Sequence, residues 1–446
     1  MIATRRWASF TLIAVLSLFV LTSAAVRAQD AGAAATAAPG QKYTMAEYNA
    51  YQAAATEKNA AAQIKELDDF VAKYPNSALL NYIYPLYYRN YGQQSNFPKT
   101  IEYADKQIAL STATPTEKYD AYTVRAYAFN HTKAPDAATA KSAYDAALAG
   151  AKLVPSVPKP DGTSDADFAK QKSDSILMFN GTAGNAAMAA KDYPNAVAAY
   201  KAVLASSPDD FLTNYFLGKA YSSMAPPQPL DAMWSYARAV GAKNATAEQS
   251  TQIKTYLRKL LANYQGGTVC DPLTDAELSE LLQLAATSVE RPATYKPYSA
   301  ADLDAARKDM TIASVVTDLK AGGDKAKLTW TASCGLEFPD VPGKIMEVTP
   351  GDPVGMKTAF VTSEAEFEAA TTPNLEVKIS GQPEAAKLEV GNSVRFTGTL
   401  ESYDPDPAFM LHWDKAKVNA EDLPKEKGAP KKPAARKPAA KKPVSK

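Results

Sequence analysis

The sequence predicts a mainly α protein in which an array of helix pairs is followed by a small β-rich domain and a disordered tail. Three observations support this fold class. Apolar and aromatic residues recur at helical spacing from Thr44 to Tyr264, and short β-branched or alternating runs follow Gly322-Gly323. From Glu421 onward the chain has almost no apolar bulk, so it cannot offset the entropy of ordering. With 446 residues, the chain is long enough for two or three folded units.

The clearest repeat spans Lys191 to Tyr221. It places Tyr200 four residues after Ala196, and a proline, Pro208, follows. Gly218 then lies three residues before the final tyrosine. This spacing resembles the tetratricopeptide repeat (TPR), a 34-residue antiparallel helix pair in which small residues let the helices approach and a proline ends the second helix. The resemblance implies a TPR-type solenoid.

About five helix pairs and a cap are expected in the solenoid, residues 44–265. The first three pairs are placed at 44–75, 84–110 and 117–152, the fourth at 177–210, and the fifth from Phe211 onward, with a closing helix at 249–264. A stretch with three prolines, residues 153–164, is expected to loop out between the third and fourth pairs. No repeat has tryptophan at its usual early position, so the first three pairs depend mainly on period and aromatic spacing.

The segment 266–298 is expected to be a linker with one helix, capped by Thr274 with Glu277 three residues later. A further helix is expected to start at Ser299. Strands are predicted at 327–331, 344–348, 357–361, 375–379, 393–400 and 409–413, with a short helix at 363–370. The Asp-Pro-Asp-Pro run, 404–407, is predicted to form the last hairpin turn, and Gly398 a bend. Residues 299–420 resemble the OB-like domains of exported bacterial proteins; another small β-rich fold is the alternative.

Residues 1–28 have the pattern of a secretory signal peptide. Arg5 and Arg6 precede an apolar run at 10–21, and Val26-Arg27-Ala28 is a small-x-small cleavage site. The apolar run is too short for a comfortable membrane span, although an uncleaved anchor is the alternative. We therefore expect a periplasmic or secreted protein with no transmembrane span in the mature chain. The polar segment 29–43 is expected to be a flexible linker.

The charge of the chain is distributed unevenly. Residues 425–446 contain nine Lys or Arg and one acidic residue, whereas residues 29–424 have a net charge of −10. The disordered Lys/Pro/Ala tail, 421–446, is predicted to contact an anionic envelope polymer or lipid headgroup; a purely solubilising tail is the alternative. Nucleic-acid binding is not expected, because it requires a basic folded face and this folded body is acidic.

The chain contains only two cysteines, Cys270 and Cys334. In an oxidising compartment they could form a disulfide, and two free buried thiols are the alternative. The two histidines, His131 and His412, lie in different regions, and no nucleophile elbow, phosphate loop, HExxH or CxxC motif is present. We therefore expect no enzyme activity, no metal site and no cofactor.

The concave groove is the expected binding site, because the first helix of each TPR pair lines it. In the aligned repeats the ninth position is occupied by Arg89, Arg125, Asn185 and Lys219, and the second and fifth positions add Tyr82, Met178 and Tyr215. Such a column of cations and amides could hold carboxylates of a peptide. It is similar in kind to the carboxylate clamp of chaperone-binding TPR domains, although that clamp's residues do not match one by one. Alternatively, these are ordinary cations on a helix surface.

These observations lead to the expectation of a non-enzymatic exported scaffold that binds a protein or peptide partner in the concave TPR groove. The alternative is a cell-wall or glycan-binding envelope protein that recognises its ligand through the C-terminal OB-like domain.

Overall fold

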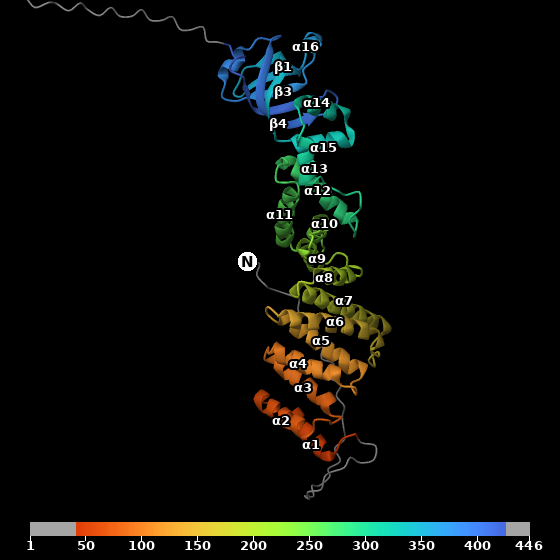
Figure 1. Cartoon of the computed structure of the whole chain (residues 1–446). Helices are drawn as coiled ribbons and strands as arrows, with labels where there is room; N and C mark the ends of the chain where they lie inside the picture. Colours follow the sequence, from red (N-terminus) through yellow and green to blue (C-terminus); the bar gives the residue numbers. More distant parts are fainter. Residues whose placement is uncertain (1–41, 425–446) are drawn as a thin grey trace, which may run out of the picture. The chain divides into compact units, whose positions relative to one another are not determined.

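The computed structural model describes residues 42–424, which form two compact units, one ending at Asn90 and the other beginning at Tyr91 (Figure 1). The predicted signal peptide, most of the predicted linker after it and the tail from residue 425 lie outside the described residues. The first unit contains α1 (Met45–Thr56), α2 (Ala60–Lys73) and most of α3 (Leu80–Gln93).

In the first unit α1 packs against α2, and α3 is hydrogen-bonded to α2. A capping box between Thr44 and Glu47 starts α1 and satisfies two backbone N–H groups. The side chain of Asn90 donates to the carbonyl oxygen of Ala60 at 3.1 Å and to Gln63 Oε1 at 2.9 Å. These bonds hold the end of this unit's third helix against its second.

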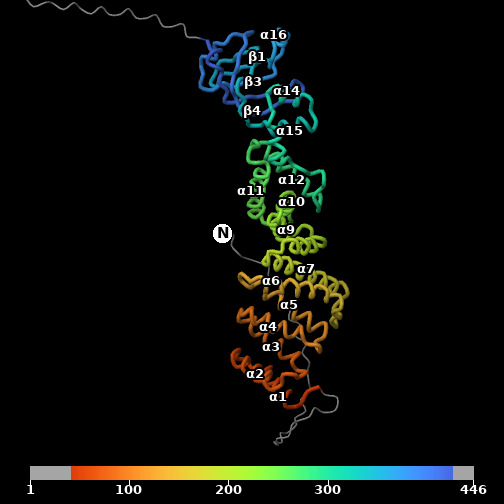
Figure 2. Tube along the Cα trace, in the orientation of Figure 1, coloured from red at the N-terminus to blue at the C-terminus, as the bar shows by residue number. Residues whose placement is uncertain are grey.

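The second unit begins with nine successive helices, each of which packs on the next. They are α4 (Phe97–Ala109), α5 (Pro115–His131), α6 (Ala137–Leu153), α7 (Asp165–Ala189), α8 (Tyr193–Leu204), α9 (Phe211–Ser223), α10 (Pro229–Val240), α11 (Ala247–Tyr264) and α12 (Asp271–Thr287). Most connections between them are short, but residues 154–164 between α6 and α7 form a longer one that begins with a 3₁₀ turn at Val154–Ser156, where the loop was predicted. Side chains such as Thr114, Asp210 and Thr246 cap the first turns. Figure 2 traces this array from helix to helix along the chain.

Glycines allow close approach between the helices of two consecutive pairs. A Cβ atom on Gly184 of α7 would lie 2.4 Å from the Tyr200 ring of α8, and a Cβ on Gly218 of α9 would lie 2.9 Å from the Tyr236 ring of α10. Both tyrosines are almost completely buried. Because glycine has no side chain, the aromatic ring of the next helix can fill the space beside it.

Helix α12 begins earlier than predicted. Cys270 is its N-cap residue, whereas Thr274 lies inside the helix and donates its hydroxyl to the Cys270 carbonyl oxygen at 3.1 Å. The predicted partner Glu277 is buried and accepts a bond from Gln265 Nε2 at 2.6 Å. The predicted capping box is thus wrong, because Pro272 provides a start one turn earlier.

The C-terminal part of the second unit is a closed barrel of five strands. The strands are β1 (Glu337–Thr349), β2 (Val354–Phe360), β3 (Leu375–Ile379), β4 (Ser393–Asp404) and β5 (Met410–Val418). Their order is β1-β2-β3-β5-β4, with β4 pairing back to β1; only the pair β3–β5 is parallel. The short helix α16 (Glu364–Ala369) joins β2 to β3, and a 3₁₀ turn at Pro383–Lys387 precedes β4.

Three further helices precede the barrel: α13 (Ala300–Arg307), α14 (Ile312–Ala321) and α15 (Gly323–Ser333). Ser299 caps α13, as predicted, but that helix ends at Arg307. Val315 and Leu319 of α14 and Ala326 of α15 belong to the same buried cluster as the barrel residues Phe396 and Trp413. Helices α14 and α15 therefore close part of the barrel core.

The predicted strand at 327–331 is wrong, since these residues lie in α15. The β-branched Thr329 and Thr331 suggested a strand, but the Thr331 hydroxyl donates to the Lys327 carbonyl oxygen one helical turn back. The Asp-Pro turn is confirmed, because β4 ends at Asp404 and β5 begins at Met410. The register of β4 against β5 shifts at the predicted bend, between residues 397 and 399.

Candidate functional site

The predicted groove residues are divided between the two compact units. Tyr82 and Arg89 are exposed and lie in the unit that ends at Asn90. Tyr82 is 52% exposed, and its ring centroid lies 5.9 Å from that of Tyr51 on α1. The remaining predicted groove residues belong to the second unit, where three different environments are found.

Arg125 is a structural residue of α5. Its side chain is 4% exposed, its Nε donates to Asp105 of α4 at 2.5 Å, and its Nη2 donates to Ser142 of α6 at 2.7 Å. The expectation that Arg125 faces a ligand is therefore wrong. Its guanidinium group is used to join three helices, and its burial could not be inferred from its place in a repeat.

Asn185 of α7 is half-buried and joins its neighbours. Its side-chain oxygen accepts a bond from the Tyr200 hydroxyl at 3.0 Å, and its Nδ2 donates to Asn130 of α5 at 3.2 Å. Met178, about two helical turns earlier on α7, packs beside the buried ring of Phe179. These two side chains stabilise the array rather than presenting a donor to solvent.

Tyr215 and Lys219 lie together on one face of α9, where Tyr215 is half-buried and Lys219 is exposed. The α9–α11 aromatic surface consists of Leu212, Tyr215, Phe216, Lys219 and Tyr256. The first four occupy one face of α9 because they follow a three- and four-residue spacing. Leu212 is 36% exposed and Tyr256, on α11, is 45% exposed.

The rings of this surface contact one another through a buried tyrosine. Tyr236 of α10 lies 5.9 Å from Tyr215 and 5.2 Å from Tyr256, measured between ring centroids. Tyr215 and Phe216 are 5.4 Å apart in an edge-to-face arrangement. Burial raises the pKa of the Tyr236 and Tyr215 hydroxyls above the ordinary tyrosine value, so both remain neutral at physiological pH.

Lys219 adds a positive charge to these rings. Its Nζ lies 5.9 Å from the Tyr215 ring centroid and 5.8 Å from that of Phe216, so it forms cation–π contacts with both. Within residues 42–424 it forms no ion pair with a carboxylate. The surface therefore combines apolar rings with a cation that has no anionic partner in this part of the chain.

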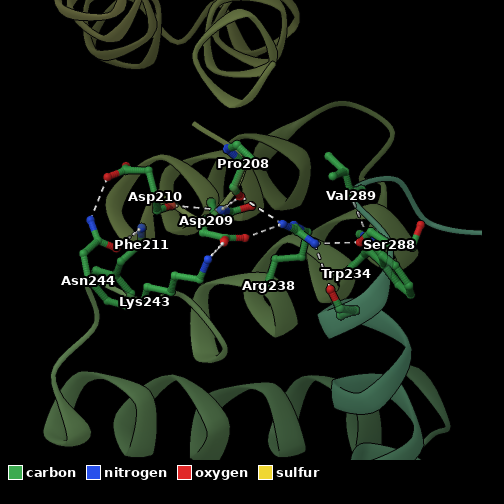
Figure 3. Close-up of polar contacts among 12 residues, drawn as sticks. Pro208, Asp209, Asp210, Phe211, Trp234, Arg238, Lys243, Asn244, Ser288 and Val289 are labelled. Atoms are coloured by element: carbon green, nitrogen blue, oxygen red, sulfur yellow. Dashed lines mark hydrogen bonds and ion pairs between the residues drawn. The ribbon is translucent and has the colours of Figure 1, made fainter. Parts of the chain in front are cut away.

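A buried arginine of α10 joins that helix to its neighbours (Figure 3). Arg238 Nη1 donates to the carbonyl oxygens of Ala285 and Ser288 at 2.8 and 2.7 Å. Its Nη2 donates to the Pro208 carbonyl oxygen at 3.0 Å and to Asp209 at 3.1 Å. Arg238 thus ties α10 to the α8–α9 turn and to the C-terminal end of α12. This role was not predicted, because its only signal in the sequence is an arginine between Ala237 and Ala239, which are both buried.

A second buried polar group lies where α11 and α12 meet. Glu277 accepts its bond from Gln265, and the Tyr295 hydroxyl and Gln265 Oε1 are buried without a hydrogen-bond partner. Desolvation by burial raises the pKa of Glu277, against the opposing effects of the Gln265 bond and of Lys327. No cation contacts this carboxylate closely enough to form an ion pair among the described residues.

Cys270 and Cys334 are joined by a disulfide with a Cα–Cα distance of 5.6 Å. It connects the start of α12 with the end of α15, and Gly335 beyond it donates its N–H to the Leu400 carbonyl oxygen of β4 at 2.8 Å. The bond therefore links the helical array to the elements that close the barrel.

Neither a metal-binding cluster nor a membrane-spanning helix is found in residues 42–424. No group of three or more His, Cys, Asp or Glu side chains there is arranged to hold a metal ion. In the same range, none of the helices has both the length and the apolar character needed to cross a bilayer.

No protein-family model matches this sequence, and no curated protein matches it either. Among solved structures, the chain is similar to BtubC (BKLC) from P. vanneervenii at 11% identity and a TM-score of 0.30, over 57% of this chain and 97% of that one. It is also similar to the TPR2AB-domain:pHSP90 complex of yeast Sti1 at 12% identity and a TM-score of 0.17, over 54% of this chain and 96% of the other. Scores this low carry no argument about this chain.

Proposed function

We propose that the protein is a non-enzymatic scaffold that binds a protein or peptide partner on the α9–α11 aromatic surface. The observation that carries the proposal is the group of partly exposed rings, Tyr215, Phe216 and Tyr256, beside Lys219, whose charge no described carboxylate neutralises. Exposed aromatic patches with a charged rim are typical of protein-interaction sites.

In this proposal the helical array is of the TPR type. Gly184 and Gly218 lie 34 residues apart, the length of a TPR unit, and each receives the aromatic ring of the helix that follows. The barrel is proposed to be OB-like, which is supported by its five strands and by the pairing of β1 with both β2 and β4.

The binding chemistry follows from the side chains present. Tyr215, Phe216 and Tyr256 would bury apolar or aromatic side chains of the partner, and each well-packed ring could contribute about 2 kcal/mol or more. Lys219 would hold a carboxylate by a charge-assisted hydrogen bond. A rigid platform lowers the entropic cost of binding, and the Arg238 bonds hold α10, the helix that carries Tyr236, against its neighbours.

The proposal includes export. Residues 1–28 support it through their signal-peptide pattern, and the cationic tail supports retention near an anionic polymer or lipid headgroup. Detection of the chain in a periplasmic or culture-medium fraction, with its N-terminus at residue 29, would test this part. A chain that stays in the cytoplasm with residues 1–28 attached would contradict it.

The binding proposal is tested by selecting peptides from a random displayed library on the full chain and measuring their dissociation constants. Tyr256→Ala and Lys219→Glu should each weaken the selected acidic–aromatic peptides about tenfold or more. Tyr127→Ala and Lys133→Glu are matched controls, since both side chains are exposed and lie on α5 and in the loop that follows it. Peptides that respond only to the controls, or to none of the four variants, would refute it.

A further inference from the structure

A buried contact between an acid and an amide lies where the last helices of the array meet the helices that precede the barrel. Gln265 is the C-cap residue of α11 and is fully buried, and Glu277 on α12 is 8% exposed. Gln265 Nε2 donates to Glu277 Oε2 at 2.6 Å. The start of α13 lies beside the next residue, since a Cβ atom on Gly266 would be 3.2 Å from that of Ala300. The contact therefore ties the end of α11 to α12 at this junction.

The amide of this contact needs a donor that an ionised carboxylate does not have. A carboxylate only accepts hydrogen bonds, whereas a protonated carboxyl also donates one O–H bond. Among residues 42–424 no donor bonds the buried Gln265 Oε1, and the buried Tyr295 hydroxyl has no partner there either. A buried amide oxygen without a donor destabilises the folded state. A protonated Glu277 would carry the missing donor directly beside that oxygen.

We propose that Glu277 is a neutral acid in the closed junction, that its O–H donates to Gln265 Oε1, and that loss of this proton opens the junction. The two side chains then form a ring of two hydrogen bonds, since the amide N–H donates to one carboxyl oxygen and the O–H of the other donates to the amide oxygen. Ionisation removes the second bond and leaves a buried charge without an ion-pair partner. The junction is therefore held closed in acid and opens more often as pH rises.

The groups around this buried carboxyl do not replace its proton. Burial is the largest influence and raises its pKa, against the opposing effects of the Gln265 bond and of Lys327 on α15, while Glu280 on α12 adds to the rise. Lys327 is exposed and forms no ion pair with the carboxyl in the described part of the chain. Tyr295 and Tyr298, from the segment before α13, have hydroxyls whose pKa burial raises, so both are uncharged at neutral pH.

Opening of the junction and release of the proton are linked with a defined sign. In an open junction the carboxyl meets water, where it titrates at about pH 4.5 like an ordinary glutamic acid. In the closed junction it keeps its proton to higher pH, so opening releases one proton in the interval between these two pH values. Within that interval the open fraction rises about tenfold per pH unit, and above it the fraction no longer depends on this group.

The movement is confined by the covalent links around it. The disulfide between Cys270 and Cys334 joins the start of α12 to the end of α15, and this link does not depend on the state of Glu277. Residues 266–270 connect α11 to α12 and include Gly266 and Gly267, which both adopt positive φ. Opening is therefore expected to separate the end of α11 from α12 while α12 stays joined to α15. The inference does not depend on the α9–α11 aromatic surface.

Infrared spectroscopy of the full chain tests the protonation state, because only a neutral carboxyl has a C=O stretch separate from the carboxylate bands. The spectrum of Glu277→Gln is subtracted from that of the parent, so that the other carboxyl groups cancel. We expect a carboxylic-acid band in this difference at about pH 5.5, where an ordinary glutamic acid is ionised, and its loss at higher pH. A difference spectrum that shows only a carboxylate at about pH 5.5 would overturn the proposal.

Hydrogen exchange of the full chain, read by mass spectrometry on peptides covering residues 261–280, tests the opening. At each pH the exchange rate of the parent is divided by that of Glu277→Gln, so that the pH dependence of the exchange chemistry cancels. Glu277→Gln keeps two hydrogen bonds in an amide–amide pair and cannot ionise. We expect the ratio to rise with pH by up to about tenfold per unit and then to level off.

Two further variants serve as controls in the exchange measurement. Glu280→Gln removes an exposed carboxylate of the same helix and should keep the rising ratio. Tyr295→Phe removes the other buried hydroxyl and should also keep it. A ratio that does not change with pH would overturn the proposal. A rise that disappears in Tyr295→Phe would also overturn it, because the proton would then lie between Glu277 and Tyr295.

Discussion

Replacing Gly184 by alanine tests whether the helices of the array are held at contact distance by glycine. The new Cβ would lie 2.4, 2.6 and 2.8 Å from three atoms of the Tyr200 ring. That ring cannot readily move, since it is 2% exposed, its hydroxyl bonds Asn185 at 3.0 Å, and it stacks on Phe216 at 6.1 Å. Overpacking of this kind costs about 1–3 kcal/mol.

The control lies three residues earlier on the same helix. A Cβ on Gly181 meets no atom within 4 Å, so Gly181→Ala should gain only the helix propensity of alanine, about 1 kcal/mol. Because both variants gain that propensity, the difference between them isolates the steric term. We expect Gly184→Ala to have a free energy of unfolding about 1–3 kcal/mol below that of Gly181→Ala, measured by urea denaturation. Equal stabilities would refute the close-packing account of the array.

Three other predictions concern the buried polar groups and the disulfide. Arg238→Met should lower the free energy of unfolding by about 3–5 kcal/mol by leaving its buried partners unpaired, while Lys243→Met, at the exposed end of the same network, should change it by less than about 0.5 kcal/mol. Replacing Cys270 and Cys334 by serine should cost about 4 kcal/mol, since the bond closes a loop of 64 residues; no loss of stability would show that the bond does not form. The raised pKa of Glu277 means that its stability contribution is present below about pH 4.5 and is lost as pH rises through the folded pKa. Glu277→Gln should therefore be more stable than the parent at neutral pH, and the difference in their free energies of unfolding should disappear in acid. A difference that does not change with pH would contradict this.

Local signals in the sequence predicted several elements correctly. Ser299 begins a helix because its hydroxyl accepts the Asp302 N–H, and the Asp-Pro run turns the last hairpin because it cannot continue a ladder. The repeat spacing placed Tyr215 and Lys219 on one helix face, where Tyr215 is half-buried and Lys219 exposed. Each of these features depends on neighbours a few residues away, which the sequence displays directly.

Features that depend on distant partners were missed or misplaced. Helix α7 begins at Asp165 rather than at the predicted residue 177, because Ser164 caps a polar first part that lacks an apolar stripe. Arg125 was expected at a binding surface, but its partners come from α4 and α6, which the repeat pattern does not specify. The Arg238 bonds to the end of α12 join residues about 50 apart and leave no local pattern.

The closure of the barrel has a consequence for how the chain folds during synthesis. Each helix of the array packs on the next, so it can fold soon after it emerges. The barrel cannot close until β5, ending at Val418, pairs with β3 and β4, and until then β3 and β4 have open edges. Open edges invite pairing with other chains, and charged side chains oppose it. The surplus of acidic residues in 336–424 would therefore keep an unfinished sheet from joining its neighbours on the same polysome.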